Sequence, residues 1–122
     1  MSKIMVVDDE VKECELLERF LGRKGYDVIT FYNGEKALEQ IRYEKPDVIL
    51  LDIKMAGMDG IEVLRNIREF DKDVGVIMVT ALNDEATGIA ATRLGANDYI
   101  TKPVDLEHLE TSIRKIWTDL LP

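Results

Sequence analysis

The chain has 122 residues, 46% of them hydrophobic and 33% charged, and this length and composition predict one globular domain over residues 1–122. Its apolar runs fall well short of the roughly 18 residues that a membrane-spanning helix needs, and we expect no membrane association and a cytoplasmic location. The formal net charge of −8 gives a surface that repels phosphate backbones, which argues against direct binding to nucleic acid.

The first half of the chain alternates short apolar runs with stretches of helical period. In chain order, the pattern predicts a strand over 4–7, a helix over 11–24, a strand over 27–31, a helix over 33–43 and a strand over 48–51. The apolar residues at helical spacing in the first helix are Leu16, Leu17, Phe20 and Leu21. Asn33 is a suitable N-cap for the second helix, and Pro46 ends it.

The second half of the chain repeats the alternation. The pattern predicts a helix from about residue 60, a strand over 74–80, a helix over 84–93, a strand around 99–101 and a helix over 105–119. Alternating strands and helices predict an α/β fold with a parallel sheet, and near-continuous apolar strands indicate helices on both faces. In such sheets ligands bind beyond the carboxyl ends of the strands, so the residues just past each strand are the candidates for chemistry.

Polar residues gather at those strand ends, and they are Asp8, Asp9, Asp52, Thr80 and Lys102. Crowded carboxylates repel one another unless a cation compensates their charge. Mg²⁺ suits such a site because it binds through one or two carboxylates and keeps waters that phosphate oxygens can replace. A calcium loop of the EF-hand type is disfavoured, because Lys54, Ala56 and Val63 occupy positions that would need oxygen ligands.

The chemistry that this group of residues indicates is transfer of a phosphoryl group to Asp52. A carboxylate beside a metal ion and a lysine can attack phosphorus, and the two cations stabilise the charge on the phosphoryl oxygens. The hydroxyl of Thr80 could hydrogen-bond the same group, and the small Ala81 next to it leaves access. The expected product is an aspartyl phosphate.

Four motifs in this order, "VVDDE", "LLDIKMAGMDG", "IMVTAL" and "GANDYITKPVD", make the chain resemble the receiver domain of two-component response regulators over essentially its whole length. The resemblance implies a flavodoxin-like fold whose five parallel strands have the order 2-1-3-4-5. It also implies a phosphoacceptor switch, which is no enzyme in the ordinary sense but assists its own phosphorylation and the hydrolysis of its aspartyl phosphate.

The resemblance further implies the roles of the acidic residues. Asp52 matches the phosphoacceptor, Asp9 matches a ligand of Mg²⁺, and Asp8 matches an acidic partner that acts on the metal through water. The backbone carbonyl of Lys54 matches the group that completes the metal site, in which Mn²⁺ could replace Mg²⁺.

Other positions match the parts that sense the phosphoryl group. Thr80 and Lys102 match the sensing pair, Tyr99 matches the aromatic switch, and the bond between Lys102 and Pro103 is cis in this family. The chain departs from the family at Ala56, where Pro is usual. Because Ala lacks the fixed φ of Pro, we expect a more mobile loop after Asp52.

The partners and the lifetime of the phosphorylated state follow from the same resemblance. The implied donor is the phosphohistidine of a sensor histidine kinase or of a histidine phosphotransfer protein. A downstream effector would read the face made by the fourth helix, fifth strand and fifth helix. Lys54 and Leu82 lie two residues beyond Asp52 and Thr80, where they would flank the phosphoryl group. Leu82 cannot orient an attacking water, which predicts a long-lived aspartyl phosphate.

Four alternatives remain. A flavodoxin-type electron carrier needs a phosphate-binding loop after the first strand, and "VVDDEVKE" would repel the flavin phosphate instead. A phosphohydrolase with an aspartate nucleophile carries that residue after the first strand, with a second Asp two positions on, whereas here the two acids are adjacent. A receiver-like interaction module without phosphorylation is disfavoured because each reactive position is intact. The chain could also be the N-terminal receiver of a longer transcriptional regulator.

Overall fold

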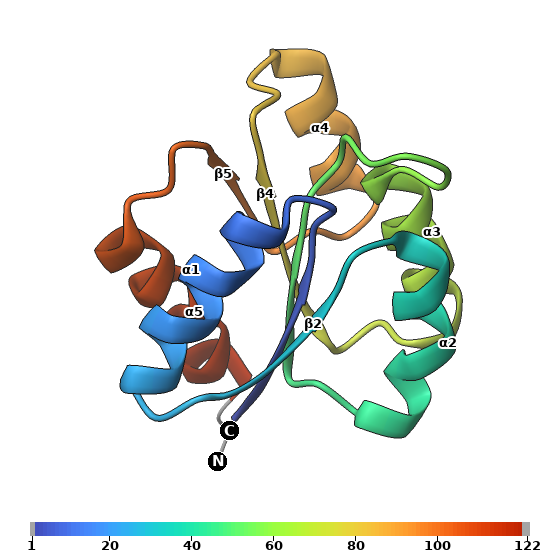
Figure 1. Ribbon diagram of the computed structural model, residues 1–122. Helices are drawn as coiled ribbons and strands as arrows, with labels where there is room; N and C mark the ends of the chain where they lie inside the picture. The colour runs from blue at the N-terminus through green and yellow to red at the C-terminus, as the bar shows by residue number, and fades with distance from the viewer. Residues whose placement is uncertain (1, 121–122) are drawn as a thin grey trace.

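The computed structural model describes residues 2–120, and a five-stranded parallel sheet runs through the middle of the molecule (Figure 1). The strands are β1 (Lys3–Val7), β2 (Asp27–Phe31), β3 (Val48–Leu51), β4 (Gly75–Thr80) and β5 (Asp98–Thr101). Their order across the sheet is β2-β1-β3-β4-β5, and each neighbouring pair is parallel. The predicted fold class and strand order are therefore confirmed.

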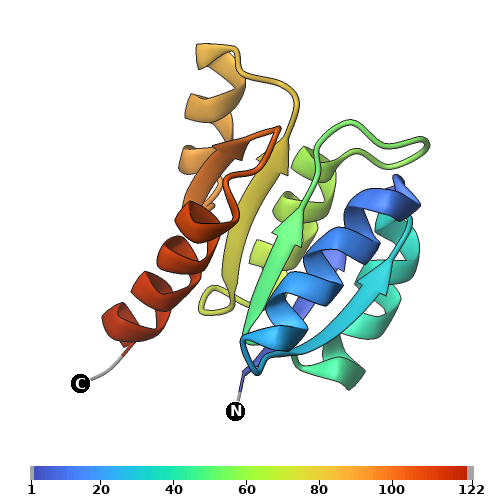
Figure 2. The ribbon, with the colours of Figure 1, turned by 60° about the vertical axis from the view of Figure 1, so that its left-hand side comes forward.

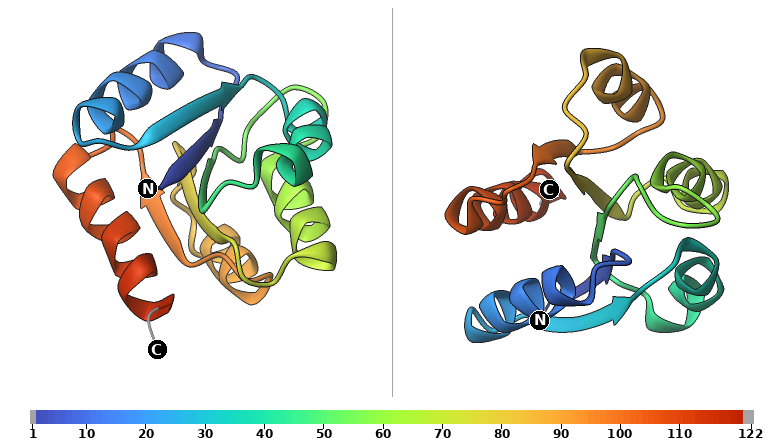
Figure 3. Two further views of the ribbon diagram at one scale, coloured as in Figure 1. Left: turned by 90° about the horizontal axis from the view of Figure 1, so that it is seen from below. Right: turned by 45° about the horizontal axis from the view of Figure 1, so that its top comes forward.

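Five helices cover the two faces of the sheet. They are α1 (Val11–Arg23), α2 (Gly34–Glu44), α3 (Gly60–Phe70), α4 (Glu85–Arg93) and α5 (Leu106–Leu120). Helices α1 and α5 pack on one face, and α2, α3 and α4 pack on the other, as both panels of Figure 3 show. None of the helices in residues 2–120 has the length and apolar character that crossing a bilayer requires.

The central strands are apolar throughout because both sides of the sheet are covered. In β3, Val48 and Leu50 point to the core under α1 and α5, while Ile49 and Leu51 point to the core under α2 and α3. Successive side chains of a strand face opposite sides, so a strand covered on both sides needs apolar residues at every position. The continuous apolar runs in the sequence have this origin.

The ends of the elements differ slightly from the predicted ones. Strand β4 begins at Gly75, one residue later than predicted. Asp84 is the N-cap of α4, and its side chain accepts a hydrogen bond from the backbone N–H of Thr87. Asn33 caps α2 as predicted, by accepting from the N–H of Lys36.

The buried face of α1 also differs from the apolar pattern. Leu16 is 42% exposed, and Cys14 takes the buried place beside Leu17 and Leu21. Residues 14, 17 and 21 follow the three- and four-residue spacing of one helix face, whereas residue 16 lies off that face. A cysteine packs there as a small apolar side chain.

Helix α4 is bound to the sheet by little apolar surface. Ala91 is its one buried residue, and Figure 2 shows the helix at the top of the molecule. Helix α3 on the same face, by contrast, buries Val63, Leu64 and Ile67. The attachment of α4 therefore depends more on the loops at its two ends.

Candidate functional site

The carboxyl ends of four strands bring the predicted site residues to one edge of the sheet. Asp8 directly follows β1 and Asp52 directly follows β3, and these strands are neighbours with Val7 opposite Leu51. Thr80 is the last residue of β4. Lys102 directly follows β5, and its backbone N–H donates to the carbonyl of Thr80 at 2.8 Å.

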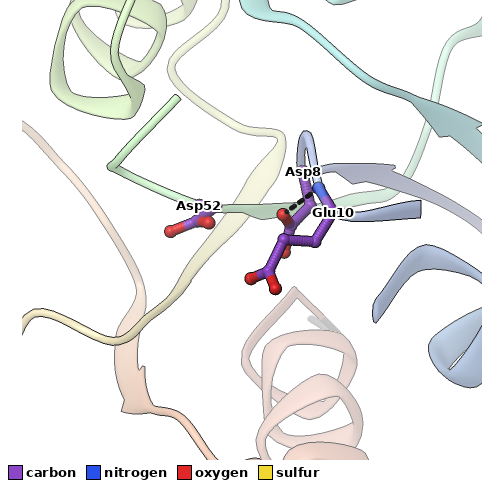
Figure 4. A group of neighbouring side chains, drawn as sticks. All are labelled: Asp8, Glu10 and Asp52. Carbon is purple, nitrogen blue, oxygen red and sulfur yellow. Dashed lines mark hydrogen bonds between the residues drawn. The ribbon is translucent and has the colours of Figure 1, made fainter. Parts of the chain in front are cut away.

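The ammonium group of Lys102 lies among three carboxylates. Its Nζ is 2.7 Å from Oδ2 of Asp8, 3.2 Å from Oδ2 of Asp52 and 3.2 Å from Oε1 of Glu10. Figure 4 shows the three acidic residues, of which Asp8 and Glu10 come from the loop after β1 and Asp52 from the end of β3. One oxygen from each lies within 4.8 Å of the others.

Burial and the contact between Asp8 and Lys102 shift the pKa of each of these two groups in opposite directions. Asp8 is 3% exposed and Asp52 is 5% exposed. Burial raises the pKa of the Asp8 carboxyl above its usual value, although the hydrogen bond from Lys102 acts in the other direction. Burial alone would lower the pKa of Lys102, but the hydrogen bond to Asp8 and the charge of Asp52 outweigh it and raise the pKa. The ammonium therefore stays charged.

The carboxylate of Asp52 is held in one orientation by the chain around it. Its Oδ1 accepts from the backbone N–H of Ile53 at 2.7 Å, while Oδ2 faces Lys102. The loop that follows closes tightly, since the N–H of Gly60 donates to the carbonyl of Ile53. A Cβ at Gly60 would lie 2.1 Å from the carbonyl oxygen of Asp52, so only glycine fits at this start of α3.

Asp9 does not join the group around Lys102. Its Oδ2 lies 3.4 Å from the backbone nitrogen of Ala56, which donates to it. A proline at position 56 would have no N–H to donate. Asp9, Lys54 and Leu82 instead line a neighbouring hollow of about 510 Å³ beside the loop after Asp52. The mobility expected from Ala56 stays a prediction.

Glu10 is the functional candidate that the sequence analysis missed. It stands at the N-cap position of α1 without a side-chain cap, and its carboxylate turns to Lys102 instead. An acid before a helix is ordinarily explained by the helix dipole, so its residue type carried little signal. Its place directly after Asp8 and Asp9 was the one available hint.

Thr80 and Tyr99 bind the two backbone polar groups of Leu82. The side chain of Thr80 is buried, and its Oγ1 accepts from the N–H of Leu82 at 3.3 Å. The hydroxyl of Tyr99 donates to the carbonyl oxygen of Leu82 at 2.6 Å. Burial and the nearby carboxylates of Asp84 and Asp52 raise the pKa of Tyr99, so this hydroxyl remains a donor. The predicted cis bond between Lys102 and Pro103 is confirmed.

The donor set fits a hard divalent cation. Carboxylate oxygens from Asp8, Glu10 and Asp52 converge, and Mg²⁺ prefers oxygen ligands of this kind. The charge of Lys102 neutralises only part of the negative charge of the three acids, so a cation at this edge would relieve the remaining repulsion.

Comparison with known proteins agrees with this geometry. A family model of the response regulator receiver domain matches residues 4–114. The chain is 45% identical over 115 residues to the probable transcriptional regulator ycf27 of Guillardia theta. It is 41% identical over 115 residues to the alkaline phosphatase synthesis transcriptional regulatory protein PhoP of Bacillus subtilis. Each match covers 94% of this chain but 45% and 48% of the relatives, so the chain spans about half of their length.

Solved structures of the same kind superpose over nearly the whole chain. A two-component response regulator from Clostridium difficile has a TM-score of 0.95 at 29% identity, with both chains covered completely. The response regulator TrrA of Thermotoga maritima, solved in complex with Mg²⁺ and BeF, has a TM-score of 0.87 at 34% identity. That match covers 95% of this chain and 99% of the other.

Proposed function

The chain belongs to the response regulator receiver family, and we propose that it is the phosphoryl-accepting switch of a two-component phosphorelay, with Asp52 as the phosphoacceptor. The observation that carries the proposal is the buried Asp52 carboxylate at the carboxyl edge of the sheet, 3.2 Å from the ammonium of Lys102. A nucleophile that attacks a phosphoryl group needs nearby positive charge, and Lys102 supplies it on the side of Oδ2.

The donor in this proposal is the phosphohistidine of a sensor histidine kinase or of a histidine phosphotransfer protein. A carboxylate oxygen of Asp52 forms a bond to phosphorus, the phosphorus–nitrogen bond breaks, and the electron pair stays on the imidazole nitrogen. Lys102 exchanges its contact with the carboxylate for one with a phosphoryl oxygen. The reaction needs no further nucleophile from this chain.

The proposed metal ligands are Asp8, Asp9, Asp52 and the backbone carbonyl of Lys54, with Mn²⁺ as a substitute for Mg²⁺. When bound, the ion supplies neutralisation of the charge on the phosphoryl oxygens. The presence of Mg²⁺ and BeF in the related structure of TrrA supports this choice of ion. Asp9 would reach the ion by giving up its long hydrogen bond from Ala56.

The proposed switch depends on the backbone N–H and carbonyl groups of Leu82. A phosphoryl oxygen attracts the hydroxyl of Thr80, whose Oγ1 now accepts from the N–H of Leu82. Tyr99 holds the carbonyl of the same residue, so a shift of the loop after β4 changes the position of this ring. Phosphorylation then shifts the equilibrium between two arrangements of the loop.

The output surface in this proposal is the face made by α4, β5 and α5. A hollow of about 560 Å³ lies there, lined by Ile89, Tyr99 and Thr101 among others. Ile89 is 42% exposed, which leaves an apolar contact for a downstream effector. A change at Tyr99 would alter this hollow directly.

A second candidate is the N-terminal receiver of a longer transcriptional regulator. The two relatives described above are transcriptional regulators, and the chain covers less than half of each. In that case the effector is a further domain of the same protein, and the acidic receiver itself stays off the nucleic acid.

The test of the proposal is phosphorylation of the Asp52→Asn variant. Wild-type protein incubated with acetyl phosphate and Mg²⁺ should gain the mass of one phosphoryl group, and Asp52→Asn should gain none, because the nucleophile is gone. Asp73→Asn is the matched control, since Asp73 is an exposed acid at the opposite end of the sheet and its variant should react like wild type. Equal labelling of Asp52→Asn and wild type would refute the assignment.

The lifetime of the phosphorylated state has its own test in Leu82→Glu. A carboxylate at the rim of the hollow can orient an attacking water, so we expect loss of phosphate to accelerate by about tenfold or more. Decay is followed by mass spectrometry after removal of the donor. Leu82→Met keeps an apolar side chain and should decay like wild type. The same decay rate for Leu82→Glu as for wild type would contradict a role of Leu82 in lifetime.

A further inference from the structure

We propose that Glu10 is a positioning residue for Lys102: as a third, solvent-facing acceptor it weakens the hold of the ammonium on the carboxylates of Asp8 and Asp52, which a divalent cation can then take over. This inference rests on the proposed function and adds to it a residue outside the expected set. Glu10 lies beside Asp8 and across from Asp52 in Figure 4.

Three hydrogen bonds occupy the ammonium group of Lys102. An ammonium group has three donors. Asp8, Asp52 and Glu10 each take one of them, so the hydrogen-bonding capacity of Nζ is used completely. Removing any one acceptor frees a donor, which then turns to water or to the acceptors that remain.

The three acceptors of Lys102 differ in their burial. The side chains of Asp8 and Asp52 are 4% and 6% exposed, whereas that of Glu10 is 66% exposed. The contact with Glu10 therefore lies on the water side of the ammonium. Without Glu10, Lys102 keeps only its two buried partners, which are the carboxylates that an incoming cation must bind.

The side chain of Glu10 is free to bind Lys102 because it does not cap α1. Its backbone N–H donates to Oδ1 of Asp8 at 2.9 Å, which fixes the position of the residue at the start of α1. Short side chains such as Ser or Asp cap a helix by accepting from its first turn. The side chain of Glu10 makes no such bond to α1 and reaches Lys102, 92 residues away in the sequence.

The net charge of the group around Lys102 also predicts that loss of Glu10 weakens the binding of Mg²⁺. Three carboxylates around one ammonium leave two negative charges uncompensated, which suits a divalent cation. Loss of Glu10 lowers this excess and also strengthens the hold of Lys102 on the two buried carboxylates, so both effects weaken the binding of Mg²⁺. Only the second effect depends on Lys102, and this difference allows the two to be separated.

The experiment is a double-mutant cycle with the affinity for Mg²⁺ alone as its readout, measured by calorimetric or NMR titration at constant ionic strength. We expect Glu10→Gln to weaken Mg²⁺ binding about three- to tenfold when Lys102 is present, which lies in the lower part of the range of coupling seen between groups in contact. In the Lys102→Met background the same substitution should have less than about a twofold effect. An equal loss in both backgrounds would show that Glu10 acts as a plain charge or as a ligand, and would overturn the proposal.

Two further variants sharpen the result. Glu10→Asp keeps the charge but is one methylene shorter, so it should behave like Glu10→Gln if reaching Lys102 is what matters. Wild-type affinity in Glu10→Asp would overturn the proposal in favour of charge alone. Glu15→Gln removes an exposed acid elsewhere on α1 and should bind Mg²⁺ like wild type. Failure of the wild-type protein to bind Mg²⁺ would defeat the proposed function as well, whereas wild-type binding with an unaffected Glu10→Gln would defeat this inference alone.

Discussion

Two half-buried cations hold opposite ends of the sheet, and their partners differ in kind. At the carboxyl end, Lys102 donates to the carboxylates of Asp8, Asp52 and Glu10. At the amino ends of β4 and β5, the guanidinium of Arg68 donates to neutral oxygens only. These are the carbonyls of Asp71 at 3.1 Å, Val74 at 2.7 Å and Gly95 at 3.1 and 2.7 Å, and Oδ1 of Asn97 at 3.2 Å.

We call Arg68 with its carbonyl acceptors the clamp, because these acceptors are fixed. We call Lys102 with its three carboxylates the exchangeable site, because another cation can take the place of the ammonium. Backbone carbonyls cannot leave without unfolding the segment that carries them, so the acceptors by which Arg68 ties the end of α3 to the turn after α4 are fixed parts of the fold. Carboxylate side chains can instead exchange Lys102 for a metal ion. Burial lowers the pKa of Arg68, against the charges of Asp71 and Asp73, yet a guanidinium remains protonated. A half-buried cation is present at both ends of the sheet, so its presence does not mark the candidate site. The candidate site is distinguished by its place at the carboxyl end of the sheet.

The two ends of α4 differ in the same way as the two ends of the sheet. The carbonyl of Gly95, just beyond its C-terminal end, is held by Arg68. Its N-terminal end follows the loop in which Leu82 is held by Thr80 and Tyr99. Because Ala91 is the only buried residue of this helix, one end is clamped and the other depends on bonds that the proposed phosphorylation would change.

The largest expected effect comes from removing the clamp with Arg68→Met. Carbonyl groups of Asp71 and Val74 lose their partner in a partly buried place, and we expect a loss of about 2 kcal/mol in the free energy of unfolding, measured by urea denaturation. Arg68→Lys is the control, because it keeps the charge but has no planar fork of donors. Recovery of full stability in Arg68→Lys would show that charge, and not the set of carbonyl bonds, holds this end.

For Lys102→Met we expect a smaller loss in the free energy of unfolding, and its size should depend on whether Mg²⁺ is present. Without divalent ions the three carboxylates lose their cation, and we expect the free energy of unfolding to fall by about 1 kcal/mol. The difference from wild type should shrink as Mg²⁺ is added, because a bound cation stabilises the folded state and replaces the missing charge. The deficit of Arg68→Met should not respond to Mg²⁺. Equal responses of the two variants would remove the distinction between clamp and exchangeable site.

The smallest effect concerns Cys14, which lies behind the acidic group and donates from Sγ to the carbonyl of Asp8 at 3.3 Å. Burial, together with the charge of Asp8, raises the pKa of this thiol from its usual 9.0 to about 12. Between those two pH values the unfolded chain loses the thiol proton and the folded chain keeps it, so stability should fall as the pH rises through this window.

Cys14→Ala provides the reference for that measurement, since other groups also titrate at high pH. The stability advantage of wild type over Cys14→Ala should decrease from pH 9 upward when both are unfolded with urea. A difference that stays constant with pH would show that the thiol is less enclosed than its buried place on α1 beside Asp8 indicates.

Local sequence was sufficient to predict the strands and the residues at their ends. Val48 to Leu51 form a strand because every position faces a covered side of the sheet, and that requirement is visible as an apolar run. Asp8, Asp52 and Lys102 were found because each directly follows a strand, and parallel strands end at one edge. Leu16 belongs to the apolar pattern of the first helix but is exposed, because helical spacing alone does not say which apolar face is buried.

Pairing between distant polar side chains was decided only by the tertiary structure. The sequence contains Arg68 as one more charged residue of a helix, and nothing local indicates that its acceptors lie up to 29 residues away. The turning of Asp9 to Ala56 and of Glu10 to Lys102 depends on side-chain torsions and on loops that meet only after the sheet has formed. Backbone periodicity is a local property of the chain, whereas the partner of a flexible charge is the nearest acceptor in space, and only the assembled fold determines which one that is.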